Sequence, residues 1–202
     1  MDNYLMLEGK KIDLTNDQVL KIKENFCFGD IQLSSLKEGE TFKIGTYEFF
    51  VLEQSGDTAT VILKEPLYDS KEFGRNNNYD GSDVDKLCVE FGKTIEKLVG
   101  KENLIEHTVD LTADDGLKCY GSIKRKMSLI TAQMYRKYVY ILDEHPLKKW
   151  WWLATAYSTA KHDDEDWVKC VSPCGGIDYY RYYDNGGVRP FCILKSNIFV
   201  SK

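Results

Sequence analysis

Hydrophobic and polar positions alternate with the period of a β-strand in two stretches of the first third of the chain. Residues 41–52 and 59–63 alternate in this way, and the turn-forming residues 54–57 lie between them. A period of two places successive side chains on opposite faces of a strand. The pattern therefore predicts a β-hairpin over residues 41–63.

Residues 1–38 show the pattern of a small extension that packs on something else. Tyr4–Leu7 and Lys11–Leu14 flank a glycine turn, which predicts two paired strands. Thr15 and Gln18 have the spacing of a capping box and predict the start of a helix. One side of that helix carries Val19, Ile22, Lys23 and Phe26. Because this apolar stripe is narrow, the helix needs a partner, either the rest of this chain or another protein.

Apolar residues recur at spacings of three and four in two later segments, which predicts two helices. The first begins after the N-cap Ser82 and ends at Gly100. The second begins after the N-cap Thr131 and reaches Leu142. Helices and strands mix without strict alternation, so the predicted fold class is α+β. We expect a single domain over residues 39–202, preceded by the extension of residues 1–38.

The last part of the domain, residues 148–202, is dense in aromatic and turn-forming residues. Four short strands are predicted there, over residues 151–157, 167–171, 177–183 and 191–195. We expect them to form a small antiparallel sheet. Trp151, Trp152 and Trp167 are predicted to have a structural role in it, because large rings dominate a small core.

Composition places the chain among ordinary globular proteins. Of 202 residues, 43% are hydrophobic and 29% are charged, which argues against disorder. The net charge of −5 does not indicate the positively charged surface that is typical of nucleic-acid-binding proteins. The longest apolar run is too short for a membrane span, and the N-terminus lacks the apolar region of a signal peptide. We therefore expect a cytoplasmic protein with six reduced cysteines, no membrane contact and no bound nucleic acid.

Several residues of the C-terminal part resemble the signature of a known family. They are Trp151-Trp152-Leu153, Tyr157-Ser158-Thr159, and Gly187-Val188-Arg189-Pro190 followed by Leu194-Lys195. They resemble the C-terminal signature of a domain-of-unknown-function family from low-GC Gram-positive bacteria and their phages. The same signature is more distantly similar to the C-type-lectin-like fold of formylglycine-generating-enzyme relatives. The resemblance covers nearly the whole chain. It implies a lectin-like, β-rich C-terminal region and names no reaction.

The resemblance also has an implication for Arg189. By analogy its guanidinium is partly buried and donates to backbone carbonyls or to a carboxylate from the preceding loops. We therefore expect Arg189 to be a structural clamp rather than a substrate-binding residue.

A run of five residues, Tyr179-Tyr180-Arg181-Tyr182-Tyr183, is the strongest candidate for a binding surface. In a strand, Tyr179, Arg181 and Tyr183 share one face, whereas Tyr180 and Tyr182 share the other. Tyrosine supplies contact area at little entropic cost and arginine stacks on it, which is typical of protein interfaces. The alternative is that one face is core and the other is ordinary surface. We predict a non-enzymatic binding module with a protein partner.

Other functions stay open at this point. One alternative is a phage-type accessory protein that inhibits a host defence factor, as anti-CRISPR proteins do, and another is a carbohydrate-binding lectin-like domain. No P-loop, Gly-x-Ser-x-Gly or His-Glu-x-x-His motif occurs. Glu106-His107 with Asp110 is a candidate acid–base pair, although a single histidine before a strand is ordinarily only hydrogen-bonded. The sequence predicts no catalytic residue, does not exclude an enzyme and sets no oligomeric state.

Two groups of residues are candidates for metal binding. His162 precedes the acidic residues 163–166, whose oxygens suit Ca²⁺ but lack the spacing of an EF-hand. Cys170 and Cys174 form one ligand pair, and a structural zinc site needs a second pair, for which only Cys192 and His162 remain. We predict no metal and no cofactor, with Cys170 and Cys174 acting as small hydrophobic residues.

Overall fold

The N-terminal part of the chain begins with a pair of strands. The computed structural model describes residues 4–7, 10–15, 17–18 and 29–202. Strands β1 (Tyr4–Leu7) and β2 (Lys10–Asp13) pair antiparallel. The predicted capping box is confirmed, because the Gln18 N–H donates to Thr15 Oγ1 at 3.2 Å and the Thr15 N–H donates to Gln18 Oε1 at 2.9 Å. The predicted stripe of Val19, Ile22, Lys23 and Phe26 lies outside the described residues.

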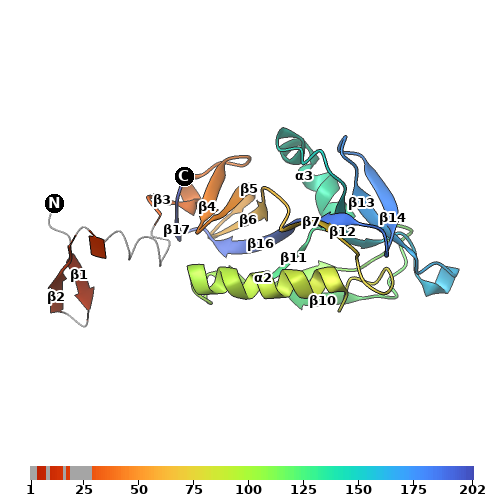
Figure 1. Ribbon diagram of the computed structural model, residues 1–202, viewed down its shortest axis with the longest axis horizontal. Helices are drawn as coiled ribbons and strands as arrows, with labels where there is room; N and C mark the ends of the chain where they lie inside the picture. Colours follow the sequence, from red (N-terminus) through yellow and green to blue (C-terminus); the bar gives the residue numbers. More distant parts are fainter. Residues whose placement is uncertain (1–3, 8–9, 16, 19–28) are drawn as a thin grey trace.

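Two sheets make up most of the body (Figure 1). The first has the order β11 (Met127–Leu129), β16 (Pro190–Lys195), β6 (Thr58–Leu63), β5 (Tyr47–Ser55) and β4 (Thr41–Ile44), and β8 (Leu104–Ile105) also pairs with β16, which makes six strands. The second has five strands in the order β14 (Ile177–Arg181), β13 (Trp167–Val171), β12 (Trp151–Ala156), β15 (Gly186–Val188) and β7 (Tyr68–Lys71). We call them the six-stranded and the five-stranded sheet.

Shorter elements complete the described structure. β9 (His107–Asp110) pairs with β10 (Ser122–Arg125), and β3 (Ile31–Gln32) pairs with β17 (Phe199–Val200). The helices are α2 (Asp83–Val99) and α3 (Ala132–Glu144), with the 3₁₀ turns η1 (Leu33–Ser35) and η2 (Ala160–His162). Within the described ranges, every strand pair is antiparallel except β12 with β15. The molecule is therefore an α+β protein, as its sequence predicts.

The core has two layers, one on each side of the six-stranded sheet. The run Phe49-Phe50-Val51-Leu52 of β5 is apolar throughout because both faces of this sheet are buried. Phe49 and Val51 belong to the cluster that contains the buried face of α2. Phe50 and Leu52 belong to the cluster that contains the buried face of α3. Figure 1 accordingly shows the two helices on opposite sides of the strands.

Three predicted boundaries differ from those of the structure. Residues 41–52 form two strands, because Gly45 takes a φ of +61° and turns the chain between β4 and β5. Residues 191–195 belong to β16 in the six-stranded sheet rather than to the aromatic sheet, and their apolar character fits a central strand that is covered on both faces. Ile31 already belongs to the body, because β3 pairs with β17 and the adjoining Leu33 is fully buried.

Trp151 and Trp152, two of the three tryptophans for which the sequence predicts a structural role, are both buried on β12. Trp151 joins the α3 cluster, and Trp152 joins the α2 cluster. The Trp152 Nε1–H donates to the Lys71 carbonyl at 2.8 Å, which ties β12 to β7 across β15. Gly186 of β15 lies against this ring, and a Cβ built there would come within 2.8 Å of Trp152 Cε2. Only glycine fits at this close approach.

Arg189 carries a charge into the interior, where its side chain is only 1% exposed. Its Nε–H donates to the Leu63 carbonyl at 2.8 Å, and Nη2 donates to the carbonyls of Lys64 at 3.0 Å and His145 at 3.4 Å. These acceptors lie at the end of β6 and just after α3. Arg189 therefore joins the six-stranded sheet to α3 by bonding backbone carbonyls at the ends of these elements.

Two aromatic rings enclose the same guanidinium. Arg189 Cζ lies 5.1 Å from the centre of the Phe50 ring and 5.3 Å from that of Trp151. Burial lowers the pKa of Arg189 to about 10, so the group is still charged at neutral pH. The desolvation cost is offset by the carbonyls and by the negative faces of the rings.

We expect Arg189→Met to lower the free energy of unfolding by about 3 kcal/mol, because three buried carbonyls lose their charged donor. Arg189→Lys keeps a charge but not the planar fork, so it should fall between the wild type and Arg189→Met. The matched control is Arg181→Met, an exposed arginine whose loss should change stability by about 0.5 kcal/mol or less. Urea denaturation measures all three. An Arg189→Met variant as stable as the control would show that the clamp contributes nothing.

His107 is a second buried ionisable group. Its Nε2 lies 2.9 Å from Ser128 Oγ, and its ring centre lies 4.6 Å from that of Phe191. Burial lowers the pKa of His107 to about 4, so the ring is neutral at physiological pH. The candidate acid–base pair of Glu106-His107 with Asp110 is not formed, because Glu106 lies on the wall of a surface groove, Asp110 accepts from Thr112, and His107 faces the core.

The low pKa of His107 makes stability depend on pH. The unfolded chain takes up a proton near pH 6.5 and the folded chain only near pH 4, so stability is complete above pH 6.5 and falls as the pH drops toward 4. Between pH 7 and pH 4.5 the wild type should lose about 2.5 kcal/mol more than His107→Asn, which has no imidazole to protonate. Urea denaturation at both pH values measures this difference. Equal losses in the two proteins would contradict the assignment.

Candidate functional site

The tyrosine-rich run 179–183 alternates between exposed and half-buried positions. Tyr179 is 45% exposed, Tyr183 is 41% exposed, and Arg181 is exposed between them. Tyr180 and Tyr182 are half-buried and pack against the core. The strand β14 ends at Arg181, and the alternation continues into the turn that follows. The two faces predicted from the sequence are therefore present.

The inward tyrosines hold β14 in place. The Tyr180 ring stacks on Trp150 with 4.4 Å between ring centres, and it meets Trp152 edge-on at 6.1 Å. The Tyr182 N–H donates to the Asp166 carbonyl at 2.8 Å. These contacts assign Tyr180 and Tyr182 to packing, and a binding role for them stays a prediction.

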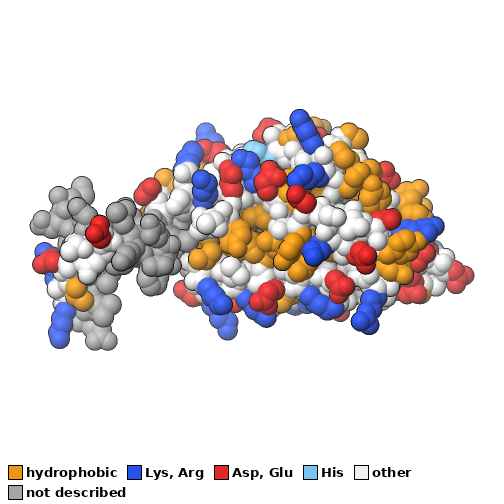
Figure 2. Space-filling view, in the orientation of Figure 1, with side chains coloured by type: hydrophobic (Ala, Val, Ile, Leu, Met, Phe, Trp, Pro, Cys, Tyr) orange, Lys and Arg blue, Asp and Glu red, His pale blue; other side chains and the backbone are white. Residues whose placement is uncertain are grey.

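The outward residues belong to a larger patch, which we call the aromatic face. It comprises Tyr157, Trp167, Lys169, Tyr179, Arg181 and Tyr183. Trp167 lies directly opposite Arg181, and Lys169 lies directly opposite Tyr179, in the antiparallel register of β13 and β14. In Figure 2, hydrophobic side chains gather over β13 and β14 at the right of the view, with acidic side chains beside them.

Trp167 differs in position from the two tryptophans with which the sequence groups it. It is half-buried on the aromatic face, where its ring meets Tyr179 edge-on at 5.3 Å. Its position follows from the register, because the outward residues of two paired strands face each other. The sequence places Trp167 in a strand, but the register that turns it outward depends on which strand lies beside it.

Two cations are interleaved with the rings of the aromatic face. Lys169 Nζ lies 5.5 Å from the ring centres of both Tyr157 and Tyr179. Arg181 Cζ lies 4.9 Å from the ring centre of Trp167 and 5.6 Å from that of Tyr183. A guanidinium or ammonium over an aromatic ring is held by the negative charge of the ring face. The side chains are therefore ordered before any partner binds.

The five-stranded sheet has edges at β14 and β7, and at β14 two of the outward backbone donors are occupied. The backbone bonds from Ser172 to Gly176 and from Tyr182 to Asp166 place the N–H groups of Tyr179 and Arg181 on the outer side. The Tyr179 N–H donates to Asp178 Oδ1 and the Arg181 N–H donates to Asp184 Oδ2, both at 2.9 Å. This edge therefore discourages the addition of another strand.

A cavity of about 480 Å³ adjoins the aromatic face at Tyr157. Within it Asp115 Oδ2 accepts the Ser158 hydroxyl at 2.6 Å and lies 3.0 Å from His162 Nδ1. The pKa of Asp115 is lowered, chiefly by the bond from Ser158. In a hydrolytic triad the imidazole stands between serine and carboxylate, whereas here the carboxylate accepts from both. Since Ser158 is also buried, this group does not present an activated nucleophile.

A buried amide holds the loop beside this cavity. Asn77 is fully buried, and its Nδ2 donates to the carbonyls of Ser158 and Trp167, both at 3.1 Å. Its Oδ1 accepts the Tyr120 hydroxyl at 2.7 Å. The asparagine triplet thus contains one residue that bonds both ends of the segment between β12 and β13. That segment includes the acidic residues 163–166.

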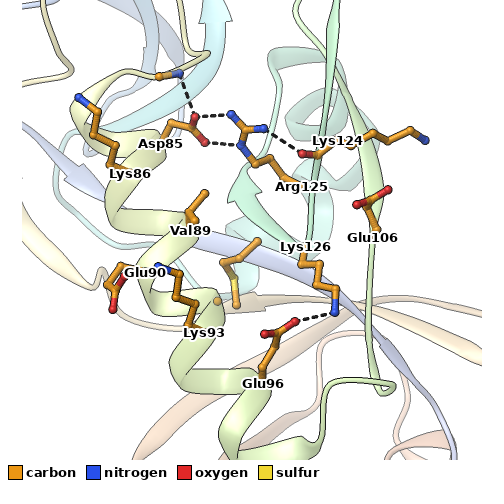
Figure 3. Close-up of a pocket in the computed structure, with 13 residues that line it drawn as sticks. Asp85, Lys86, Val89, Glu90, Lys93, Glu96, Glu106, Lys124, Arg125 and Lys126 are labelled. Carbon is orange, nitrogen blue, oxygen red and sulfur yellow. Dashed lines mark hydrogen bonds and ion pairs between the residues drawn. The ribbon is translucent and has the colours of Figure 1, made fainter.

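A groove of about 710 Å³ lies between α2 and the strands β10 and β11 (Figure 3). Its walls are tied together by ion pairs. Arg125 Nη2 lies 2.6 Å from Asp85 Oδ2, and Lys126 Nζ lies 2.5 Å from Glu96 Oε1. Because these charges neutralise one another across the groove, it offers no concentrated charge of one sign, and we do not assign the function to it.

The residues of the two candidate metal-binding groups are separated in the structure. Cys170 is buried in β13, Cys192 is buried in the other sheet, and Cys174 is exposed in a turn. His162 faces Asp115 rather than a cysteine. Within the described part of the chain, no three His, Cys, Asp or Glu side chains form a group that could hold a metal ion.

Neither a scan against protein-family models nor a search of the curated proteins finds a match to this chain. Among the described helices, none is both long and apolar enough to cross a membrane. The assignment of a function therefore depends on the chemistry of the surface itself.

The reactivity of the cysteine thiols tests which cysteines are buried in the native protein. We expect a thiol reagent to modify Cys119 and Cys174 in the native protein, and Cys88, Cys170 and Cys192 only after unfolding. Cys174 should react first, because hydrogen bonds from Ser172 and from a backbone N–H lower its pKa. Peptide mapping by mass spectrometry measures each site. Modification of Cys170 as fast as Cys174 would show that β13 is not packed as described.

Proposed function

We propose that this chain is a protein-binding module and that the aromatic face is its contact surface. The observation that carries the proposal is the exposure of Tyr157, Tyr179 and Tyr183, each more than 40% exposed, beside two cations on one face of a sheet. Tyrosine, tryptophan and arginine are the residues that most often dominate the binding energy of protein interfaces.

The side chains of the aromatic face are already fixed in position, which lowers the entropy cost of binding a partner. A mobile side chain loses rotamer freedom when a partner immobilises it, at a cost of about 0.5–1.5 kcal/mol each. Here Tyr157 and Tyr179 contact each other with 5.1 Å between ring centres, and Arg181 is held between two rings. Much of that cost is met during folding, which leaves more of the contact energy for the partner.

We further propose that residues 148–202 form a lectin-like region and that the protein works in a reducing cytoplasm. The arrangement of β12, β13, β14 and β15 in one sheet supports the first, and the free described cysteines, three of them buried, support the second. Exposed rings also favour a second candidate ligand, because sugars stack on tyrosine in carbohydrate-binding proteins. The inhibition of a host defence factor stays a prediction.

The proposal is tested by affinity purification from a Gram-positive bacterial lysate with the wild type and with Tyr179→Ala/Tyr183→Ala. We expect one stoichiometric protein partner, at least about tenfold depleted with the double variant. The control is Tyr140→Ala, which removes a tyrosine that is 85% exposed on α3 and lies off the face. Melting temperatures near that of the wild type confirm folding.

Recovery of the same partner at full strength with Tyr179→Ala/Tyr183→Ala would contradict the proposed surface. A different result would favour the carbohydrate-binding candidate instead. In that case no protein partner is recovered, and the wild type binds immobilised oligosaccharide whereas Tyr179→Ala/Tyr183→Ala does not.

A further inference from the structure

Arg181 has an environment unlike that of the other arginines with described contacts. Arg125 and Arg136 each pair with an aspartate, at 2.6 Å and 2.8 Å, and Arg189 is bonded to backbone carbonyls in the core. Arg181 is exposed, and among the described residues no carboxylate oxygen lies within 4.0 Å of its guanidinium. The nearby carboxylate of Asp184 accepts the Arg181 backbone N–H instead.

The guanidinium is also fixed in orientation. It lies between the rings of Trp167 and Tyr183, and its Nη1 donates to the Tyr183 hydroxyl. Stacking leaves the edge of the planar group, which carries the remaining N–H donors, open to a ligand. Two parallel N–H groups match the two oxygens of a carboxylate in spacing and direction.

We propose that Arg181 is a carboxylate-binding residue and that the protein partner presents one carboxylate to the open edge of its guanidinium. The inference rests on the proposed function and specifies the chemistry of its partner. The carboxylate belongs to an acidic side chain or to the C-terminus of a peptide segment, and an apolar residue beside it covers Tyr179.

The charges around the face favour a carboxylate in a protein over the phosphates of a nucleic acid. Asp166, just before β13, and Asp184, in the turn after β14, lie near Arg181, and the whole chain carries −5. One carboxylate can be accommodated by one fixed guanidinium. A strand of phosphates would bring further negative charges against those aspartates.

The occupied edge of β14 restricts how the segment binds. The outward N–H groups of Tyr179 and Arg181 already have acceptors in Asp178 and Asp184. A partner therefore gains little from main-chain bonds along this edge, and recognition has to come from side chains on the face. The face is therefore suited to recognise a partner segment that carries one carboxylate with an apolar residue next to it.

The test uses the full chain and a phage-displayed library of random dodecapeptides. Enriched sequences are synthesised with amidated and with free C-termini, and in versions with Glu→Gln or Asp→Asn. We expect the enriched peptides to share an acidic residue or a free C-terminus next to an apolar residue. Replacing the carboxylate by an amide, or Arg181 by Met, should weaken binding at least about tenfold. The two kinds of C-terminus identify the source of the carboxylate.

Two variants separate orientation from charge. Arg181→Lys keeps the charge but loses the planar fork, and it should bind the peptides nearly as weakly as Arg181→Met. Tyr183→Phe keeps the ring and removes only the hydroxyl that accepts from Nη1, so binding should weaken several-fold. Lys97→Met, at an exposed lysine on α2, is the control for loss of a positive charge.

Peptides that bind Arg181→Met as tightly as the wild type, yet lose binding with Tyr179→Ala/Tyr183→Ala, would overturn the carboxylate site and keep the protein-binding face. Peptides insensitive to both variants, or a library without binders, would overturn both. Tighter binding of an oligo-dT strand than of any peptide, abolished by Arg181→Met, would show that the site takes phosphate and would also overturn the proposal.

Discussion

The buried guanidinium of Arg189 is the constraint on which the arrangement of the two layers depends. A charge this deep requires several acceptors at once, and the chain supplies them from places far apart in sequence, at Leu63, Lys64 and His145. The end of β6, the segment after α3 and the start of β16 can satisfy Arg189 only in one relative position. Phe50 and Trp151 close around it, so hydrophobic packing and charge satisfaction favour the same geometry.

The side chains of the aromatic face are held in place because β14 packs against this core. Trp151 contacts Arg189, and the neighbouring Trp152 meets the Tyr180 ring on the inner side of β14. The outer side of the same strand carries Tyr179 and Arg181. A strand whose inward residues are anchored cannot slide or rotate without losing those contacts, since a shift of one residue would exchange its two faces. The aromatic face and the packed face of β14 are therefore two sides of one sheet.

A feature of this structure can be predicted from the sequence when it is fixed by residues that lie close together in the chain, and not when it is fixed by residues far apart. The start of α2 at Ser82 and its end at Gly100 are local signals, and the structure has both. The alternation of residues 179–183 is also local, and it identifies the outward tyrosines. Strand β7 was not predicted, because its four residues are exposed and its pairing with β15 joins segments far apart in sequence. The outward position of Trp167 depends likewise on the register of β13 with β14.

The two cations of the face have different surroundings, because the Lys169 side chain is buried and the Arg181 side chain is exposed. Lys169 lies within 3.3 Å of Asp114, so its charge is already compensated within the chain. Arg181 lies two residues farther from the core along the paired strands, opposite Trp167, where rings rather than carboxylates surround it. Asp178 and Asp184 accept backbone N–H groups at the strand edge. Asp178 and Asp184 thus occupy two outward N–H groups of the strand edge, and neither carboxylate forms an ion pair with the Arg181 guanidinium.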